Sequence, residues 1–107
     1  MTPAAYLPPH ANASISDISA MLKTMAHPER LNILYLLFES ERSFDELIEQ
    51  TGLSSHLLSN HLTKLRRSGI VSFTRFHRIT EYRIVSEKAR SLLGTLYRRH
   101  FSDRSIN

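Results

Sequence analysis

Hydrophobic residues recur at helical spacing through most of this chain, and they alternate with polar residues in one short stretch. The helical spacing covers residues 14–26, 28–38, 44–52, 55–69 and 87–101. The alternating stretch is rich in β-branched and aromatic residues and forms two segments, 70–75 and 79–84. The pattern predicts a mainly α-helical domain with one small β-hairpin, in the order α-α-α-α-β-β-α.

The two middle helices have clear end signals. Ser43 and Glu46 have the spacing of a capping box, in which each side chain bonds the other residue's backbone amide. Ser54 is placed to cap the next helix, and Gly52 and Gly69 are placed to end the two helices. Two short helices joined by a tight turn are typical of a helix-turn-helix, which binds duplex DNA.

The second of these helices has an apolar face that should pack inward. Leu58, Leu62 and Leu65 fall on one stripe, and Leu57 and His61 lie on its flank.

The opposite face of this helix carries side chains that can pair with base edges or phosphates. They are Ser55, His56, Ser59, Asn60, Thr63, Lys64 and Arg67. Any amphipathic helix has a polar outer face, but no acidic residue stands between Glu49 and Glu81. We therefore predict that this helix reads DNA.

Basic residues also gather in the hairpin. Its expected tip is Phe76-His77-Arg78, and Glu81 is its single acid. A charged hairpin tip is ordinarily a solvated turn. Because this hairpin directly follows the predicted reading helix, we predict a wing instead. Its Arg75, His77 and Arg78 would contact phosphates or the minor groove.

Charge is distributed unevenly along the chain. The 107 residues have a formal charge of +4 and a pI near 9.9. Residues 1–63 hold three basic and seven acidic side chains, whereas residues 64–107 hold eleven and three. A basic half of this kind is typical of a protein that binds a polyanion, either nucleic acid or an anionic membrane surface.

The length and the 41% hydrophobic content predict one domain with a modest core. Residues 1–13 contain three prolines and are expected to be a flexible arm, residues 14–101 the folded domain, and residues 102–107 a short tail. The chain has no run of 18 apolar residues and no signal-peptide pattern. We therefore expect a cytoplasmic protein that does not bind membranes.

The last helix has an apolar stripe that a compact domain would leave uncovered. Ala89 belongs to this stripe, and His100 lies near the middle of the same face. The first helix offers apolar positions of its own. We predict that the two helices form a two-fold homodimer interface through Ile18, Met21, Leu22, Leu92, Leu93, Leu96 and Tyr97.

Two long stretches and the end of the hairpin follow the motifs of a known family. The stretches are LKTMAHPERLNILYLL from Leu22 and ELIEQTGLSSHLLSNHLTKLRRSGIV from Glu46, and the hairpin ends in EYRI. Over roughly residues 18–100 the chain resembles the ArsR/SmtB winged-helix repressors. The resemblance implies a dimeric repressor on an imperfect inverted repeat in double-stranded DNA, released by a signal. It assigns DNA-facing positions to Ser55, His56, Ser59, Asn60 and His61, and wing positions to Arg75 and Arg78.

The chain departs from that family at the wing tip and at the sensor. His77 stands where the tip usually has glycine. A cysteine-rich sensor is impossible in a chain without cysteine. Other members bind metal through acidic and imidazole ligands on the last helix, and Glu87, His100 and Asp103 lie near those positions, but Ala89 occupies one of them. These three are the candidate metal ligands, in a site completed by water or by a second chain, and no other cofactor is expected. The alternatives are a dimer-interface histidine for His100 and a frayed tail for Asp103.

Three further histidines have structural explanations. His27 precedes Pro28, where the family usually has Asp or Asn, and we expect it to start a helix and not to bind metal. His61 is expected either to pack beneath the reading helix or to donate to a phosphate. His10 lies in the predicted arm.

The motifs exclude the common enzyme classes, since the chain has no glycine-rich phosphate loop, nucleophile elbow or HExxH sequence. Two rival functions use the same fold: a winged helix that contacts protein, and one that binds DNA nonspecifically as an architectural protein. The basic wing argues against the first, and the charge distribution fits the second as well. We expect a sequence-specific DNA-binding transcriptional regulator, a homodimeric repressor.

Overall fold

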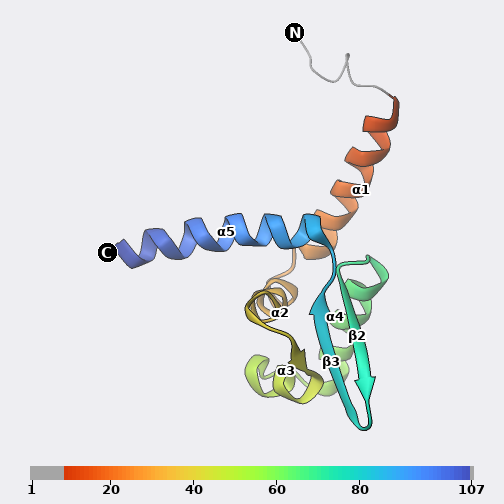
Figure 1. The fold of residues 1–107 in the computed structure, drawn as a ribbon, viewed down its shortest axis with the longest axis vertical. Coiled ribbons are helices and arrows are strands. Elements are labelled where there is room, and N and C mark those ends of the chain that lie inside the picture. The colour runs from red at the N-terminus through yellow and green to blue at the C-terminus, as the bar shows by residue number, and fades with distance from the viewer. Residues whose placement is uncertain (1–8, 107) are drawn as a thin grey trace.

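The computed structural model describes the backbone of residues 9–106 and the side chains of residues 14–100. The elements, in order, are α1 (Pro9–Met25), α2 (Pro28–Glu39), β1 (Arg42–Ser43), α3 (Phe44–Thr51), α4 (Ser55–Arg67), β2 (Val71–Phe76), β3 (Ile79–Ile84) and α5 (Glu87–Ile106). Helices α2, α3 and α4 form a body with the β2–β3 hairpin along one side, and α1 and α5 extend away from it (Figure 1). The predicted mainly α-helical fold with a hairpin is confirmed.

The predicted ends of the two middle helices are confirmed. Ser43 and Glu46 form both bonds of the capping box, and Gly52 ends α3 with a left-handed φ of 73°. The Ser54 side chain accepts a hydrogen bond from a backbone amide in the first turn of α4. Gly69 follows α4 with a φ of 74°. Any other residue at either position would need a left-handed backbone conformation, which L-residues rarely adopt.

The sheet has one strand more than the sequence predicted. Its order is β1-β3-β2, and Arg42 and Ser43 of β1 pair with β3. A strand of two residues is too short to show any alternation, which explains why it was missed. The hairpin itself is confirmed, but its register places Phe76 opposite Ile79, so the turn consists of His77 and a single further residue.

The first and last helices are longer than predicted. Helix α1 begins at Pro9, so residues 9–13 of the expected arm are helical. Proline fits the first turn of a helix, where its missing amide has no partner to lose. Helix α5 continues to Ile106 through most of the expected tail. No proline or glycine follows Phe101 to stop it. Residues 1–8 of the expected arm lie outside the described part.

The core is built around α2, which packs against α3, α4, α5 and β3. Its Ile33, Leu34 and Leu37 are fully buried. The remaining core side chains come from the elements around it, and they are Met25, Leu47, Leu58, Leu62, Leu65, Ile70, Val71, Tyr82, Ile84, Ala89 and Leu93. Among the described residues, no helix is long and apolar enough to cross a membrane.

Candidate nucleic-acid interface

Helix α4 is oriented by the burial of its apolar stripe. Leu58, Leu62 and Leu65 are enclosed in the core, as predicted. The opposite side is therefore turned to solvent, and it carries the predicted reading residues. Thr63 is half-buried, and the exposed members are Ser55, His56, Ser59, Asn60, Lys64 and Arg67.

Local hydrogen bonds hold part of this exposed face in place. Asn60 Nδ2 lies 3.4 Å from His56 Nε2, one turn earlier. The Thr63 hydroxyl donates to the Ser59 carbonyl at 2.8 Å, so its oxygen remains an acceptor. The first turn of α4 carries no acid and lies at the positive end of the helix dipole, and its Leu57 amide is already bonded to Ser54 Oγ. This arrangement suits a phosphate at the start of α4.

Two predictions about α4 were wrong. His61 is 8% exposed, so it does not belong to the DNA-facing side, although the alternative that it packs beneath the helix is confirmed. Its spacing of three residues from Leu58 explains this, since that position shares the buried stripe. Leu57 is 46% exposed and does not pack inward, because it lies past the edge of that stripe.

His61 meets the start of α2. Its ring centroid is 4.7 Å from that of His27, and its Nε2 is 3.5 Å from Glu29 Oε1. Burial, and next the charge of His27, lower the pKa of His61, whereas Glu29 acts in the opposite direction. His27 also caps α2 by accepting a hydrogen bond from the Glu29 amide, so its predicted role at a helix start is confirmed.

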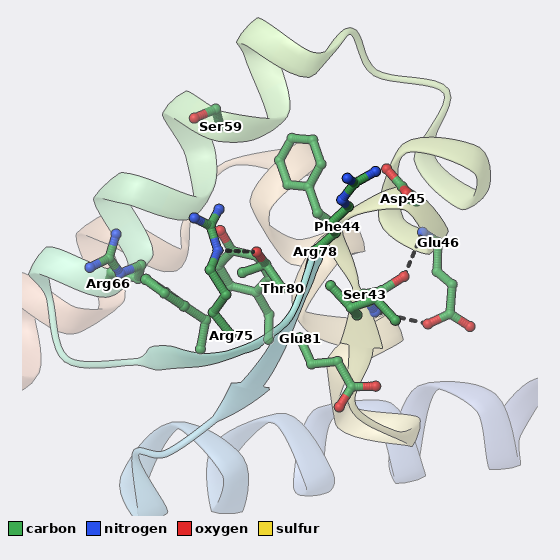
Figure 2. A pocket seen from close by; sticks show the side chains of 13 residues that line it. Ser43, Phe44, Asp45, Glu46, Ser59, Arg66, Arg75, Arg78, Thr80 and Glu81 are labelled. Carbon is green, nitrogen blue, oxygen red and sulfur yellow. Dashed lines mark hydrogen bonds between the residues drawn. The ribbon is translucent and has the colours of Figure 1, made fainter.

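A cleft of about 660 Å³ lies between α4, the hairpin and the start of α3. It is lined by Ser43, Phe44, Asp45, Glu46, Ser59, Arg66, Phe73, Arg75, Arg78, Ile79, Thr80, Glu81 and Tyr82. Figure 2 shows Arg66 and Arg75 on the side of α4, below Ser59, and Arg78 pointing toward the start of α3. The structure therefore brings the predicted wing arginines to the same cleft as the reading helix.

Arg66 is a basic residue of this cleft that the sequence analysis missed. Its guanidinium lies 4.3 Å from the centroid of the Phe73 ring in β2, a cation–π geometry. Arg75 is held by a bond of 3.2 Å from its Nε to the Thr80 hydroxyl. Burial raises the pKa of Tyr82, and the charges of Arg66 and Arg75 oppose this rise. Helical spacing puts Arg66 between the two faces of α4, and only the fold places Phe73 beside it.

Acidic side chains limit where a polyanion can lie in the cleft. Asp45, Glu46 and Glu81 also line it. Glu46 accepts a hydrogen bond of 2.8 Å from the Ser43 amide in the capping box, and it stays at the start of α3. The acids at the start of α3 therefore reduce the attraction for a phosphate there, and Arg78, which points toward them, partly offsets their charge.

The wing tip contains a residue in the conformation usually left to glycine. His77 has a φ of 58°, in the left-handed region. This position is where the family resemblance would place glycine. Phe76 and Ile79, which flank the turn, are both exposed.

An apolar groove of about 670 Å³ runs between α1 and α5. Ile18, Met21 and Leu22 line it from α1, and Leu92 lines it from α5. One predicted interface residue does not fit, because Leu93 is 0% exposed and belongs to the chain's own core.

Of the two remaining predicted interface residues on α5, Tyr97 packs within its own chain and Leu96 is exposed. Tyr97 is half-buried within the chain, where its hydroxyl donates to the Leu31 carbonyl at 3.0 Å and its ring packs on Tyr35 and Phe38. Leu96 is 49% exposed.

Within one chain, the predicted metal ligands Glu87 and His100 of α5 are not brought together, and a site shared with a second chain stays a prediction. Glu87 and His100 are thirteen residues apart on one helix, or about 20 Å at 1.5 Å per residue, so one ion within a chain cannot reach both. The Asp103 side chain lies outside the described residues. Within the described residues, the group with metal-ligand spacing is instead His27, Glu29 and His61.

A helix-turn-helix whose second helix exposes a polar face beside a basic β-hairpin defines a winged helix-turn-helix protein. Comparison with known proteins identifies the family to which the chain belongs. Residues 27–72 match the family model described as bacterial regulatory protein, arsR family. The chain is 39% identical over 82 residues to the biofilm growth-associated repressor of Xylella fastidiosa, covering 77% of this chain and 72% of that protein. The protein belongs to the arsR family of bacterial regulatory proteins and is a transcriptional regulator.

Solved structures agree with this assignment. HlyU from Vibrio cholerae superposes with a TM-score of 0.77 at 33% identity, covering 79% of this chain and 92% of that one. A homodimeric winged helix-turn-helix DNA-binding domain from Mycobacterium bovis, described as a possible ArsR-family regulator, gives a TM-score of 0.77 at 25% identity. That match covers 95% of this chain and 93% of the other.

Proposed function

We propose that the protein is a homodimeric repressor that binds an inverted repeat in double-stranded DNA. The observation that carries the proposal is the outward face of α4, where His56, Ser59 and Asn60 are exposed next to the basic side of the cleft. In this arrangement α4 enters the major groove, and Arg66, Arg75 and Arg78 meet the phosphates beside it. Binding to the bacterial chromosome would place the protein in the cytoplasm.

The dimer sets the spacing of the two reading helices. The exposed apolar side chains of the α1–α5 groove, with Ile18 and Leu22 among them, are the surface that a second copy would cover. The Mycobacterium bovis relative is described as homodimeric, which supports the same assembly here. Two α4 helices about 34 Å apart would then reach successive major grooves on one side of the duplex.

Sequence-specific reading makes Asn60 the decisive residue. An asparagine on an exposed recognition face can bond adenine through both amide atoms, and the bond to His56 holds it in place. We expect Asn60→Ala to cost roughly 1–3 kcal/mol of binding and to relax base preference at one position per half-site. Binding sites selected from a random duplex pool with the unaltered protein and with the variant would show the relaxed base preference, and binding isotherms would give the cost in free energy. Asn32→Ala, an exposed asparagine on α2 outside the cleft lining, is the matched control.

The competing function is nonspecific DNA coating, which would use the same basic cleft. A salt titration on the selected duplex and on a scrambled duplex separates the two functions. Both affinities should fall with salt, because phosphate contacts release counterions. A specific regulator keeps a ratio of about 10³ or more between the two duplexes. Equal affinities, together with an Asn60→Ala variant that weakens all duplexes alike, would assign the protein to the nonspecific class.

A further inference from the structure

A cluster of three potential metal ligands lies on the inner side of α4, opposite its polar face. His27 and Glu29 come from the start of α2, and His61 comes from the middle of α4. Their ligand atoms all lie within 4.8 Å of one another. None of these side chains is needed on the outer face of α4, so the cluster is separate from the proposed DNA contacts.

We propose that His27, Glu29 and His61 form a binding site for a divalent transition-metal ion such as Zn²⁺. Two imidazoles and one carboxylate are a donor set that Zn²⁺ accepts, with water as the fourth ligand. The Glu29 side chain is 44% exposed, which leaves a path for the ion and for that water. His61 is buried and fixed by its neighbours, and its Nε2 already faces the carboxylate at 3.5 Å.

The geometry also shows what binding would require. Around a tetrahedral Zn²⁺, ligand atoms lie about 3.4 Å apart, so the cluster must contract slightly. His61 Nδ1 is buried, with no hydrogen-bond partner among the described residues, and would carry the ring proton when Nε2 binds the ion. The positive charge of Arg30 acts on His61 as well. Both effects oppose binding, so the site should be weaker than a structural zinc site.

His27 cannot cap α2 and bind the ion at the same time. Its Nδ1 now accepts the hydrogen bond from the Glu29 amide that caps α2. A neutral imidazole has one lone pair on its ring nitrogens. If Nδ1 bound the ion, that lone pair would be used. If Nε2 bound it, Nδ1 would carry the proton. In either case the cap bond is lost, so metal binding is coupled to the first turn of α2.

Metal titrations of the full chain without DNA test the site. Co²⁺, followed by its visible absorption, and Zn²⁺, followed by calorimetry, should each bind at one ion per chain. Glu29→Gln and His61→Gln should each reduce the affinity at least tenfold. His100→Gln should leave it unchanged, because His100 belongs to the separate group on α5. Absence of a Co²⁺ band, or loss of binding in His100→Gln with retention in Glu29→Gln, would overturn the proposal.

A second measurement does not depend on how well the buried His61 variant folds. In ¹H–¹⁵N spectra of the unaltered chain, Zn²⁺ should shift the Glu29 amide, since that amide loses its bond to His27, and a chelator should restore it. Shifts confined to α5 or to the wing would contradict the assignment. Because neither experiment contains DNA, both can fail while the proposed function holds, and the reverse is also true.

Discussion

His77 occupies the turn of the wing in a backbone conformation that costs an L-residue about 1–2 kcal/mol. We predict that His77→Gly raises the free energy of unfolding by about 0.5–1 kcal/mol, since glycine removes that cost but loses more backbone entropy. Urea denaturation at a fixed protein concentration measures the change. His56→Gly, at an exposed helical position, is the control and should instead lower stability by about 1 kcal/mol. A destabilised His77→Gly would show that the ring itself supports the turn.

Tyr97 joins α5 to α2 through the bond from its hydroxyl to the Leu31 carbonyl. Removal of the hydroxyl in Tyr97→Phe should cost about 0.5–1.5 kcal/mol of stability. Urea denaturation at neutral pH measures this loss. A variant as stable as the unaltered chain would show that packing of the ring is sufficient.

The same phenol predicts a loss of stability in alkali. Burial, and next the Tyr35 phenol, raise the pKa of Tyr97 from 10.0 to about 12. Between these values the unfolded chain releases the proton more readily than the folded chain does. The stabilising contribution is therefore complete below pH 10 and is lost as the pH rises toward 12. Unfolding measured at pH 9 and 11 should show a smaller loss for Tyr97→Phe than for the unaltered chain. Equal losses would contradict the assignment.

Single residues show where sequence reasoning stops. The stripe through Leu58 fixed the orientation of α4, but its width was misjudged, so His61 was assigned partly to DNA and Leu57 to the core. His27 was expected only to start a helix, because nothing in sequence spacing relates it to a residue 34 positions later. The fold brings them together by packing the start of α2 against the inner side of α4.

The wing is the element whose role can be tested separately from α4. Arg78 is exposed at the cleft and should contact phosphate and not bases. We predict that Arg78→Ala weakens binding to specific and random duplexes by the same factor and reduces the salt slope by about 1. Binding isotherms at several salt concentrations measure both. Arg99→Ala, an exposed arginine on α5, should change neither. An unchanged slope in Arg78→Ala would remove this side chain from the phosphate contacts.

Elements with local end signals were predictable, and those without were not. The capping box of α3 and the glycines after α3 and α4 depend on neighbouring residues, and all appear as expected. Strand β1 depends on a distant partner, β3, and has no local signal. The extra turns of α1 and α5 lie where composition indicated an arm and a tail.

Assembly of the whole molecule can be tested on α5, where Leu96 is exposed outside the lining of the α1–α5 groove. Leu96 is half exposed, so Leu96→Glu should leave the fold intact, produce monomers and weaken DNA binding strongly. Leu93→Glu, one turn from it in the core, should unfold the chain instead. Light scattering together with circular dichroism separates these outcomes. A folded, fully dimeric Leu96→Glu variant would show that α5 does not form the interface.

At the scale of the whole molecule, the sequence indicated more apolar residues on α1 and α5 than one chain would bury. It could not show which of them belong to the chain's own core and which are left for a second copy. Helical spacing puts Leu93 and Leu96 on one stripe, and only the packing of α5 on α2 shows that the first is claimed by the chain's own core. The cleft could not be predicted for a similar reason, since the start of α3 and the wing, which line it together, come from segments far apart in sequence.

The two residues of β1 have a mechanical consequence. Ser43 pairs with Glu81 in the wing and also caps α3, so one residue fastens the hairpin to the helix-turn-helix. The distance between wing and reading helix is therefore set by the protein. DNA that meets both must match that distance in its groove width, or bend until it does. Base sequences that narrow or widen easily would then be preferred at positions that no side chain touches.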